Sequence, residues 1–250
     1  MNRMLTVGEK MSRYKASALH LFGSACVLML AFLLIYRVWF PGKLFSAVGG
    51  SDLLRLLAGV DLILGPLVML IIFDHKKKWL KLDIALVLLC QLGFLGYGLW
   101  TIFSARPVYI AFVEDRFYMV RANEVDAADQ AKAGNPVFKS LPYLGPVYVG
   151  TRQPADQKIR NEIALSGLAG MGIQNLPQYF VPYTDVQQQV KSMAKTSAQL
   201  LFLDQASRLR LQEEEKKYAE HPVLFLMLVR KSGPLAVVIR QSTGQVIDII

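Results

Sequence analysis

Three long apolar runs dominate the N-terminal part of the chain. They extend from about Ala16 to Val38, from Leu53 to Phe73 and from Ile84 to Phe103, and charged residues are rare within them. At about 1.5 Å per residue, about 20 helical residues cross a hydrocarbon core of about 30 Å. The first run is too long for the apolar part of a cleavable signal peptide, and no small-residue cleavage site follows it. Three transmembrane helices are therefore predicted, in preference to three buried helices of a water-soluble protein.

Beyond Ser104 the pattern changes to short apolar runs between turn residues, which is typical of strands. Val108–Val113 and Arg116–Arg121 flank a turn at Glu114-Asp115 and predict a hairpin. Val223–Val229 is apolar on both faces, which indicates a place in the middle of a sheet. It is followed by a turn at Lys231–Pro234 and by two more predicted strands, Leu235–Ile239 and Val246–Ile250.

Helical patterns separate the first hairpin from the later strands. Thr184 with Gln187 forms a capping-box signal for the longest of them. The Pro- and Gly-rich segment Asn135–Pro154 is predicted as a loop. The predicted helical segments are a short one within Asn123–Gly134, one over Asp156–Leu168, and one from Thr184 to about Glu220 that is interrupted near Thr196.

These elements predict a membrane protein with three N-terminal transmembrane helices and a C-terminal α+β domain. The domain is expected to contain an antiparallel sheet of four or five strands, with helices inserted after the first hairpin. The chain then divides into a short tail at residues 1–15, a three-helix module at residues 16–104 and a domain at residues 105–250.

The formal net charge of +9 is concentrated beside the apolar runs, because 11 of the 28 Lys and Arg but only 5 of the 19 Asp and Glu precede Arg106. Positive flanks stay in the cytoplasm. The segments before Ala16 and around Lys76–Lys81 are therefore predicted to be cytoplasmic, and the Phe40–Asp52 loop and everything after Ser104 to lie outside. Membrane lipid is the partner that this charge predicts, and no nucleic acid, because no nucleic-acid-binding motif accompanies it. Three aromatic residues near the span ends fit interfacial anchors: Trp39, Trp79 and Trp100.

Asp61 is a carboxylate about eight residues inside the second apolar run, where insertion costs about 2.5–3.5 kcal/mol. Such residues usually face the helix bundle and have a partner, for which Tyr97 and Arg37 are the candidates. Asp61 is interpreted as a residue that holds the three helices together or that binds a partner's transmembrane helix. Transport or proton relay is a third interpretation. Nearby Gly65-Pro66 predicts a kink. A small-residue stripe suited to close helix contact is formed by Cys90, Gly93, Gly96 and Tyr97.

The sequence shows no catalytic constellation, and neither a cofactor nor a metal is expected. Cys26 and Cys90 both fall within apolar runs, so the C-terminal domain contains no cysteine. His221 is the only histidine of that domain, which excludes a Cys/His metal site there. His20 and His75 stand apart from each other. Since no nucleophile elbow, P-loop, zinc-protease or dinucleotide motif is present, the chain is predicted not to be an enzyme.

Several segments resemble one known family. They are MSRYKASALHL from Met11, YRVWFPG, GVDLILGPLVMLIIF, LGFLGYGLW and RPVYIAFVEDRFYMVRANEVD, and they are similar to the TfpX/TfpZ-type type IV pilin accessory proteins. The resemblance is strongest from Met11 to Asp126 and continues more loosely through LPYLGPVYVGTRQPAD. The GVD…LGP span and the RPVY…F…DRF hairpin are specific together and weak individually. The residues before Met11 lie outside the resemblance, which makes Met11 an alternative start to Met1.

The resemblance implies a multi-pass protein of the bacterial inner membrane with a cytoplasmic N-terminus and a periplasmic C-terminal domain. It implies a non-catalytic, chaperone-like factor for one particular type IV pilin, with other inner-membrane pilus assembly proteins as further partners. A pilin subunit waits in that membrane with one apolar helix and an external head. A periplasm-facing modifying enzyme and a sensory membrane protein are the alternatives. The motif positions that become candidates for partner contact or structure are Asp61, Gly65, Pro66, Tyr97, Arg106, Pro107, Tyr109, Asp115, Arg116 and Phe117.

The first hairpin, Val108–Arg121, starts a few residues after the third apolar run and is therefore expected close to the membrane surface. If one of its strands lies at a sheet edge, its unpaired backbone groups are available for strand addition by a pilin head. The alternative is that the hairpin only packs the core of the domain.

Overall fold

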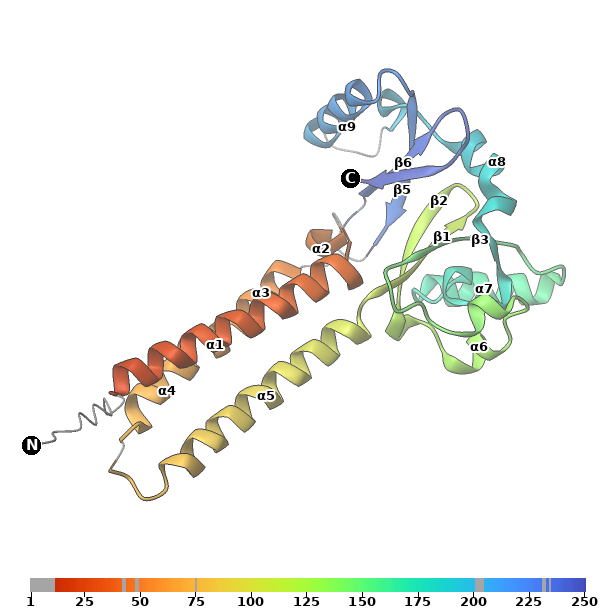
Figure 1. Ribbon diagram of the computed structural model, residues 1–250. Coiled ribbons are helices and arrows are strands. Elements are labelled where there is room, and N and C mark those ends of the chain that lie inside the picture. Colours follow the sequence, from red (N-terminus) through yellow and green to blue (C-terminus); the bar gives the residue numbers. More distant parts are fainter. Residues whose placement is uncertain are drawn as a thin grey trace, which may run out of the picture. The chain divides into compact units, whose positions relative to one another are not determined.

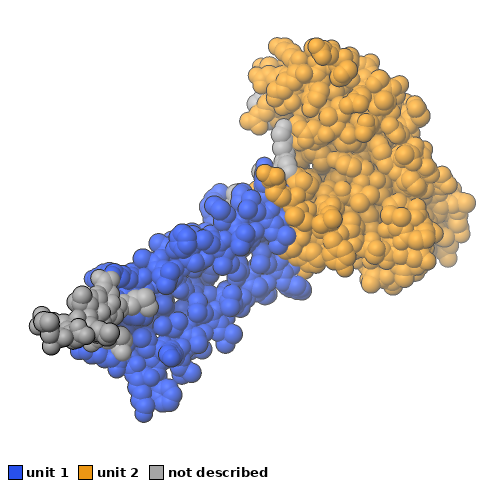
Figure 2. All heavy atoms as spheres, viewed as in Figure 1, with its two compact units in different colours: residues 1–36, 49–102 blue, residues 37–48, 103–250 orange. Residues whose placement is uncertain are grey.

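The computed structural model describes residues 12–41, 44–47, 50–74, 76–200, 205–230, 233 and 235–250. The choice between Met1 and Met11 as the start, most of the predicted tail, His75 and most of the predicted Lys231–Pro234 turn lie outside the described residues. The chain forms two compact units, coloured separately in Figure 2. Unit 1 comprises Met1–Tyr36 and Gly49–Ile102, and unit 2 comprises Arg37–Val48 and Phe103–Ile250.

The three predicted long apolar helices are present, and each is long and apolar enough to cross a membrane (Figure 1). The first is α1 (Arg13–Leu34) with its π-helical continuation η1 (Ile35–Trp39). The second consists of α3 (Gly50–Ala58), η2 (Gly59–Leu64) and α4 (Gly65–Ile72), and the third is α5 (Leu80–Ser104). Large apolar side chains on all three are exposed, among them Leu30, Ile71 and Leu89. Such a surface suits lipid and not water.

The second helix changes from π-helical to α-helical geometry at Gly65-Pro66, where the sequence predicts a kink. A proline inside an α-helix lacks the N–H donor, and its ring clashes with the carbonyl four residues earlier. The wider π-helical turn is the local alternative: the N–H of Gly65 donates to the carbonyl of Val60, five residues earlier. The Pro66 carbonyl accepts a buried hydrogen bond from Ser17 Oγ at 2.9 Å, which ties α4 to α1.

The predicted small-residue stripe, Cys90 to Tyr97, makes no close helix contact with the described residues, so that prediction is wrong within this chain. A Cβ added at Gly93 or Gly96 would meet none of their atoms within 4 Å. The close approach is instead at Gly98, where an added Cβ would lie 2.5 Å from Cδ2 of Leu57. Spacing places residues on one face of a helix, but it does not show which face a neighbour covers.

Unit 2 is an α+β domain built on a mixed sheet of seven strands. The strands are β1 (Pro107–Val113), β2 (Arg116–Arg121), β3 (Val147–Thr151), β4 (Phe180–Pro182), β5 (Val223–Val229), β6 (Leu235–Arg240) and β7 (Val246–Ile249). Their order is β4-β3-β1-β2-β5-β6-β7. The expectation of four or five antiparallel strands is therefore wrong, because β3 pairs with β1, and β5 with β2, in parallel. The central place predicted for Val223–Val229 is confirmed.

The Asn135–Pro154 segment, predicted as a loop, contains β3. Its Pro and Gly residues flank a short run that pairs with β1 from Tyr109↔Val147 to Phe112↔Gly150. Gly150 is required there because α8 (Tyr183–Met193) packs on the strand. A Cβ at Gly150 would lie 2.5 Å from Cγ1 of Val186. A glycine that reads as a loop signal in the sequence is here a site of close packing.

The region predicted as helical from Thr184 to Glu220 is two helices, α8 and α9 (Gln205–Lys217), with a break around η7 (Ser197–Gln199), as predicted. The capping box predicted at Thr184 is wrong. β4 runs directly into α8, so Pro182 takes the N-cap position without a side-chain cap. The capping box is formed instead by Thr196 with Gln199 at η7. Two further helices of unit 2 are α6 (Ala127–Ala131) and α7 (Gln157–Leu168).

Side chains cover both faces of the sheet. One face carries a core of Phe112, Phe117, Leu226, Leu228, Val237 and Ile239, covered by Val186 and Val190 of α8. Leu44 of α2 (Leu44–Ala47) joins this core, so the connection between the first two helices contributes to unit 2. The opposite face packs Tyr109 against Phe138 and Phe180, and Phe225 and Val238 against Leu211 of α9.

The first hairpin lies inside the sheet and not at its edge. β1 lies between β3 and β2, and β2 lies next to β5, so the edge strands are β4 and β7. Strand addition at this hairpin, considered from the sequence, is therefore wrong, and its alternative, core packing, is what the structure shows. The joint between β2 and β5 is short, with Phe117 paired to Leu228 and Tyr118 to Val229.

Candidate functional site

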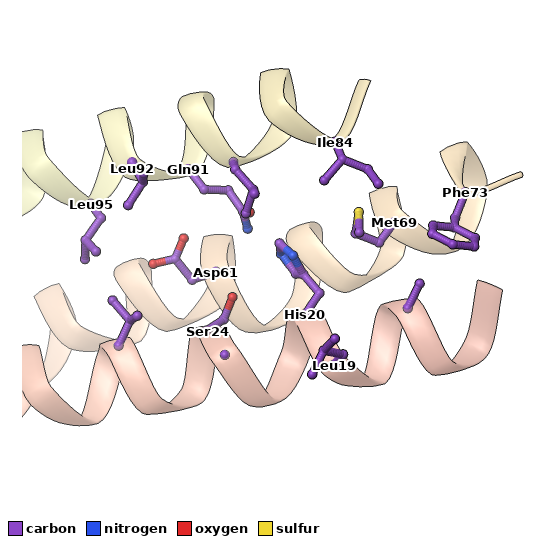
Figure 3. Close-up of a pocket in the computed structure, with 14 residues that line it drawn as sticks. Leu19, His20, Ser24, Asp61, Met69, Phe73, Ile84, Gln91, Leu92 and Leu95 are labelled. Atoms are coloured by element: carbon purple, nitrogen blue, oxygen red, sulfur yellow. The ribbon is translucent and has the colours of Figure 1, made fainter. Parts of the chain in front are cut away.

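A cavity of about 450 Å³ lies among the three apolar helices of unit 1 (Figure 3). Most of its lining is apolar, as expected inside a hydrocarbon layer. Gly23 and Ala16 of α1 contribute little side-chain volume, which leaves the space open. Large aliphatic side chains of α5 line the opposite wall, among them Leu88, Leu92 and Leu95.

Four polar side chains interrupt this apolar lining: Asp61 of η2, His20 and Ser24 of α1, and Gln91 of α5. Figure 3 shows Asp61, His20 and Gln91 directed into the same space. The Nε2 atoms of His20 and Gln91 are buried and make no hydrogen bond to any described residue. Asp61 is also buried, with 6% of its surface exposed. Buried polar groups are normally paired, so these groups are suited to accept a partner from outside.

Of the two candidate partners of Asp61, only Tyr97 belongs to the same compact unit. Tyr97 is 69% exposed and its ring lies 6.3 Å from that of Trp100, so the predicted pairing with Asp61 is wrong. Arg37 belongs to the other compact unit. The polar neighbours of Asp61 in the cavity are instead His20 and Gln91.

Gly65 lies close to two of these groups. A Cβ at Gly65 would overlap Nε2 of Gln91 and would lie 2.6 Å from Nε2 of His20. Any larger residue at position 65 would therefore displace the ends of these two side chains. The π-helical turn that precedes Gly65 also carries Asp61, through which the GVD…LGP motif contributes to the cavity lining. π-Helical turns of this kind are frequent at functional sites.

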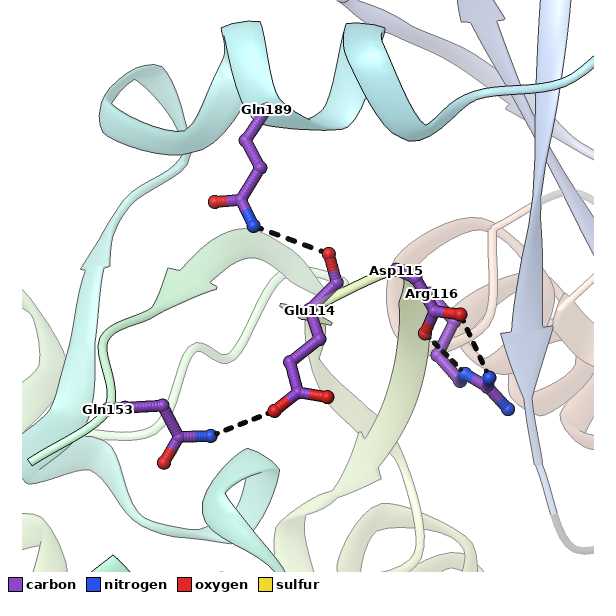
Figure 4. A network of polar contacts seen from close by, with 5 residues as sticks. All are labelled: Glu114, Asp115, Arg116, Gln153 and Gln189. Carbon is purple, nitrogen blue, oxygen red and sulfur yellow. Dashed lines mark hydrogen bonds and ion pairs between the residues drawn. The ribbon is translucent and has the colours of Figure 1, made fainter. Parts of the chain in front are cut away.

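The tip of the β1–β2 hairpin is a second polar cluster, in unit 2 (Figure 4). Glu114 has a φ of +56°, a left-handed conformation that costs a non-glycine residue about 1–2 kcal/mol. Its carbonyl accepts from Nε2 of Gln189 at 3.3 Å, and its carboxylate accepts from Nε2 of Gln153 at 3.4 Å. Asp115 accepts two hydrogen bonds from Arg116, at 2.7 and 2.9 Å, which lower the pKa of the Asp115 carboxyl. The tip is thus held in place while this ion pair remains partly exposed.

The other motif positions of unit 2 are buried. Phe117 is fully buried, with its ring 5.4 Å from that of Phe112. Tyr109 is buried on the opposite face and donates to the carbonyl of Ser140 at 3.3 Å. Pro107 begins β1 opposite Arg121. Arg106 is 4% exposed, and its desolvation lowers its guanidinium pKa.

Comparison with curated proteins finds fimbrial assembly proteins of Dichelobacter nodosus. The serogroup I protein is 28% identical over 187 residues, which is 74% of this chain and 72% of that protein. The protein of serogroups C1 and C2 is 30% identical over 113 residues, which is 44% of this chain and 86% of that protein. The chain belongs to the fimbrial assembly protein family. No family model matches it, and no solved structure does.

Of the four polar residues of the cavity, Asp61 was predicted from the sequence as a site residue, and His20, Ser24 and Gln91 were not. A signal was available, since all four are polar positions inside apolar runs. The side chains of His20 and Gln91 cost less free energy to insert into a membrane than a carboxylate does. Neither residue was therefore predicted as a site residue. The cavity offers hydrogen-bond donors and acceptors but no group of three His, Cys, Asp or Glu that could hold a metal among the described residues.

Proposed function

We propose that this protein is a non-catalytic, chaperone-like accessory factor of the TfpX/TfpZ type, which holds one particular type IV pilin in the bacterial inner membrane before assembly. Membership of the fimbrial assembly family supports a role in pilus biogenesis. The observation that carries the finer proposal is the cavity of unit 1, where buried polar atoms lack partners within an apolar wall.

The cavity fits one face of a partner's transmembrane helix better than a soluble substrate. Its apolar wall matches aliphatic side chains, and its small residues allow a helix to approach closely. Asp61, His20 and Gln91 add hydrogen bonds to a partner that carries a polar group at the same depth. Such a bond within a membrane contributes about 0.6–2 kcal/mol. This combination provides affinity through packing and selectivity through the polar group.

Asp61→Leu tests this proposal. The substitution removes an insertion cost of about 2.5–3.5 kcal/mol, so the protein remains in the membrane. Loss of one hydrogen bond of the size given above predicts that the amount of pilin co-purified falls about 3- to 30-fold. Asp61→Asn, which keeps two hydrogen-bonding atoms, is the matched control and should retain most of the binding. Wild-type capture of pilin by Asp61→Leu would remove Asp61 from the recognition site.

The proposed arrangement also requires a defined orientation, with the N-terminus and Lys76–Lys81 in the cytoplasm and the C-terminal domain in the periplasm. The basic flanks of the apolar helices support it. Topology reporters inserted at Gly49, His75 and Gly134 are expected to report outside, inside and outside. A cytoplasmic signal at Gly134 would contradict both the orientation and contact with an external pilin head.

A further inference from the structure

Two of the apolar helices end beside each other within unit 2. Trp39 is the last residue of η1 and Phe103 is the penultimate residue of α5. Their ring centroids lie 5.1 Å apart. If both helices cross the membrane, these two rings mark the level at which the chain leaves the hydrocarbon. Aromatic residues are enriched at that level.

Arg106 ties the loop around Pro142 to this level. Its guanidinium carbon lies 3.7 Å from the centroid of the Phe103 ring. The same guanidinium donates to the carbonyl of Phe103 at 2.8 Å and to the carbonyl of Pro142 at 3.1 Å. Tyr143 then stacks on Phe103, with centroids 6.3 Å apart and ring planes 17° from parallel. The buried arginine therefore links the end of α5 to the loop.

The other end of the loop is fixed by the turn that follows η1. Gly145 has a φ of +69°, and a Cβ added there would lie 3.5 Å from Cγ of Pro41 and 3.7 Å from the carbonyl oxygen of Val38. The loop thus contacts the ends of both helices. In spite of these fixed points, Tyr143 is 69% exposed and Leu144 is 81% exposed.

We propose that the loop of residues 142–145 contacts the surface of the lipid bilayer, with Tyr143 among the head groups and Leu144 at the boundary of the acyl chains. The loop is attached to the same residues that mark where two helices leave the hydrocarbon, so it lies at the same level. The composition of the loop also favours contact with lipid. The segment LPYLGP at residues 141–146 contains no charged residue and presents one aromatic and one large aliphatic side chain. A rigid loop of this kind seats unit 2 at a fixed height on the membrane.

The test places an environment-sensitive label at Leu144. The native cysteines, which are exposed on the apolar helices, are replaced (Cys26→Ala and Cys90→Ala), and Leu144→Cys is labelled with bimane in the full-length chain. Leu168→Cys on α7 is the matched control, because Leu168 is also a highly exposed leucine, at 87%. Each variant is reconstituted as single copies in nanodiscs, with ordinary or brominated phospholipid.

The expected result is blue-shifted emission at position 144 and quenching by brominated lipid at least twofold stronger than at position 168, with iodide quenching in the opposite order. Equal iodide quenching at the two positions and no lipid quenching at position 144 would overturn the proposal. Blue-shifted emission without lipid quenching would also overturn it and would assign the loop to a protein contact. No pilin is present, so the outcome is independent of the proposed function.

Discussion

Phe117→Ala is expected to lower the free energy of unfolding of unit 2 by about 3–5 kcal/mol. The side chain is fully buried, and its ring packs against those of Phe112, Tyr148 and Tyr183. The variant therefore loses the burial of an aromatic side chain and leaves a cavity. The effect is local to the β2–β5 joint, since Phe117 is paired with Leu228. Pulse proteolysis of the detergent-solubilised full-length chain across a urea series measures it.

Two variants make the Phe117 measurement specific. Phe117→Leu retains most of the buried volume and should cost less than about 1.5 kcal/mol. Arg116→Ala, at the partly exposed neighbouring position, removes a surface ion pair and should change the free energy of unfolding by about 1 kcal/mol at most. A loss below about 1 kcal/mol for Phe117→Ala would mean that the surrounding rings close the space, and that this core is not tightly packed.

Gly23→Leu is expected to reduce co-purification of the pilin to background and to abolish surface pili. Gly23 lines the cavity of unit 1, and a Cβ added there meets no described atom within 4 Å. A leucine therefore enters open space and occupies the volume that the partner helix needs. Leucine also favours the helix over glycine by about 0.8–1 kcal/mol, so the variant should fold and insert normally. Membrane yield and pilin capture are measured on the same preparation.

Gly93→Leu is the matched control for the cavity variant. It adds the same atoms at another glycine whose added Cβ meets no described atom within 4 Å, on α5 but outside the cavity lining. Pilin capture by Gly93→Leu should stay within about twofold of wild type. The reverse pattern, with Gly93→Leu inactive and Gly23→Leu active, would place the pilin on the exposed small-residue face of α5 and would contradict the cavity as the binding site.

The three long helices were predictable because the pattern that indicates a transmembrane helix lies within one short stretch of sequence. About 20 apolar residues in a row suffice, and no knowledge of distant contacts is needed. The strand order was not predictable for the opposite reason. β3 lies among Pro and Gly residues that read as a loop, and it becomes a strand only through pairing with Tyr109–Phe112. The parallel pairing of Phe117 with Leu228 joins segments far apart in the chain, and nothing in either segment alone indicates it.

The candidate site was predictable only in part. Asp61 was predicted because a carboxylate within an apolar run is costly to insert into a membrane and usually has a structural or functional role. Its neighbours were misassigned, since depth along the helix suggested Tyr97, whereas the rotation of α5 brings Gln91 to the cavity and leaves Tyr97 exposed. Rotation depends on helix packing, and a uniformly apolar helix gives no pattern from which to infer it.

The short β2–β5 joint has a consequence for the order of folding. The β1–β2 hairpin forms from neighbouring residues, but β2 receives its second neighbour only when β5 arrives, after the intervening residues 122–222. Parallel pairing across such a separation is slow, because a long loop must close before any contact compensates for the lost chain entropy. During synthesis β2 therefore presents an open strand edge that the finished protein no longer has. In that interval unit 2 is most exposed to aggregation and proteolysis.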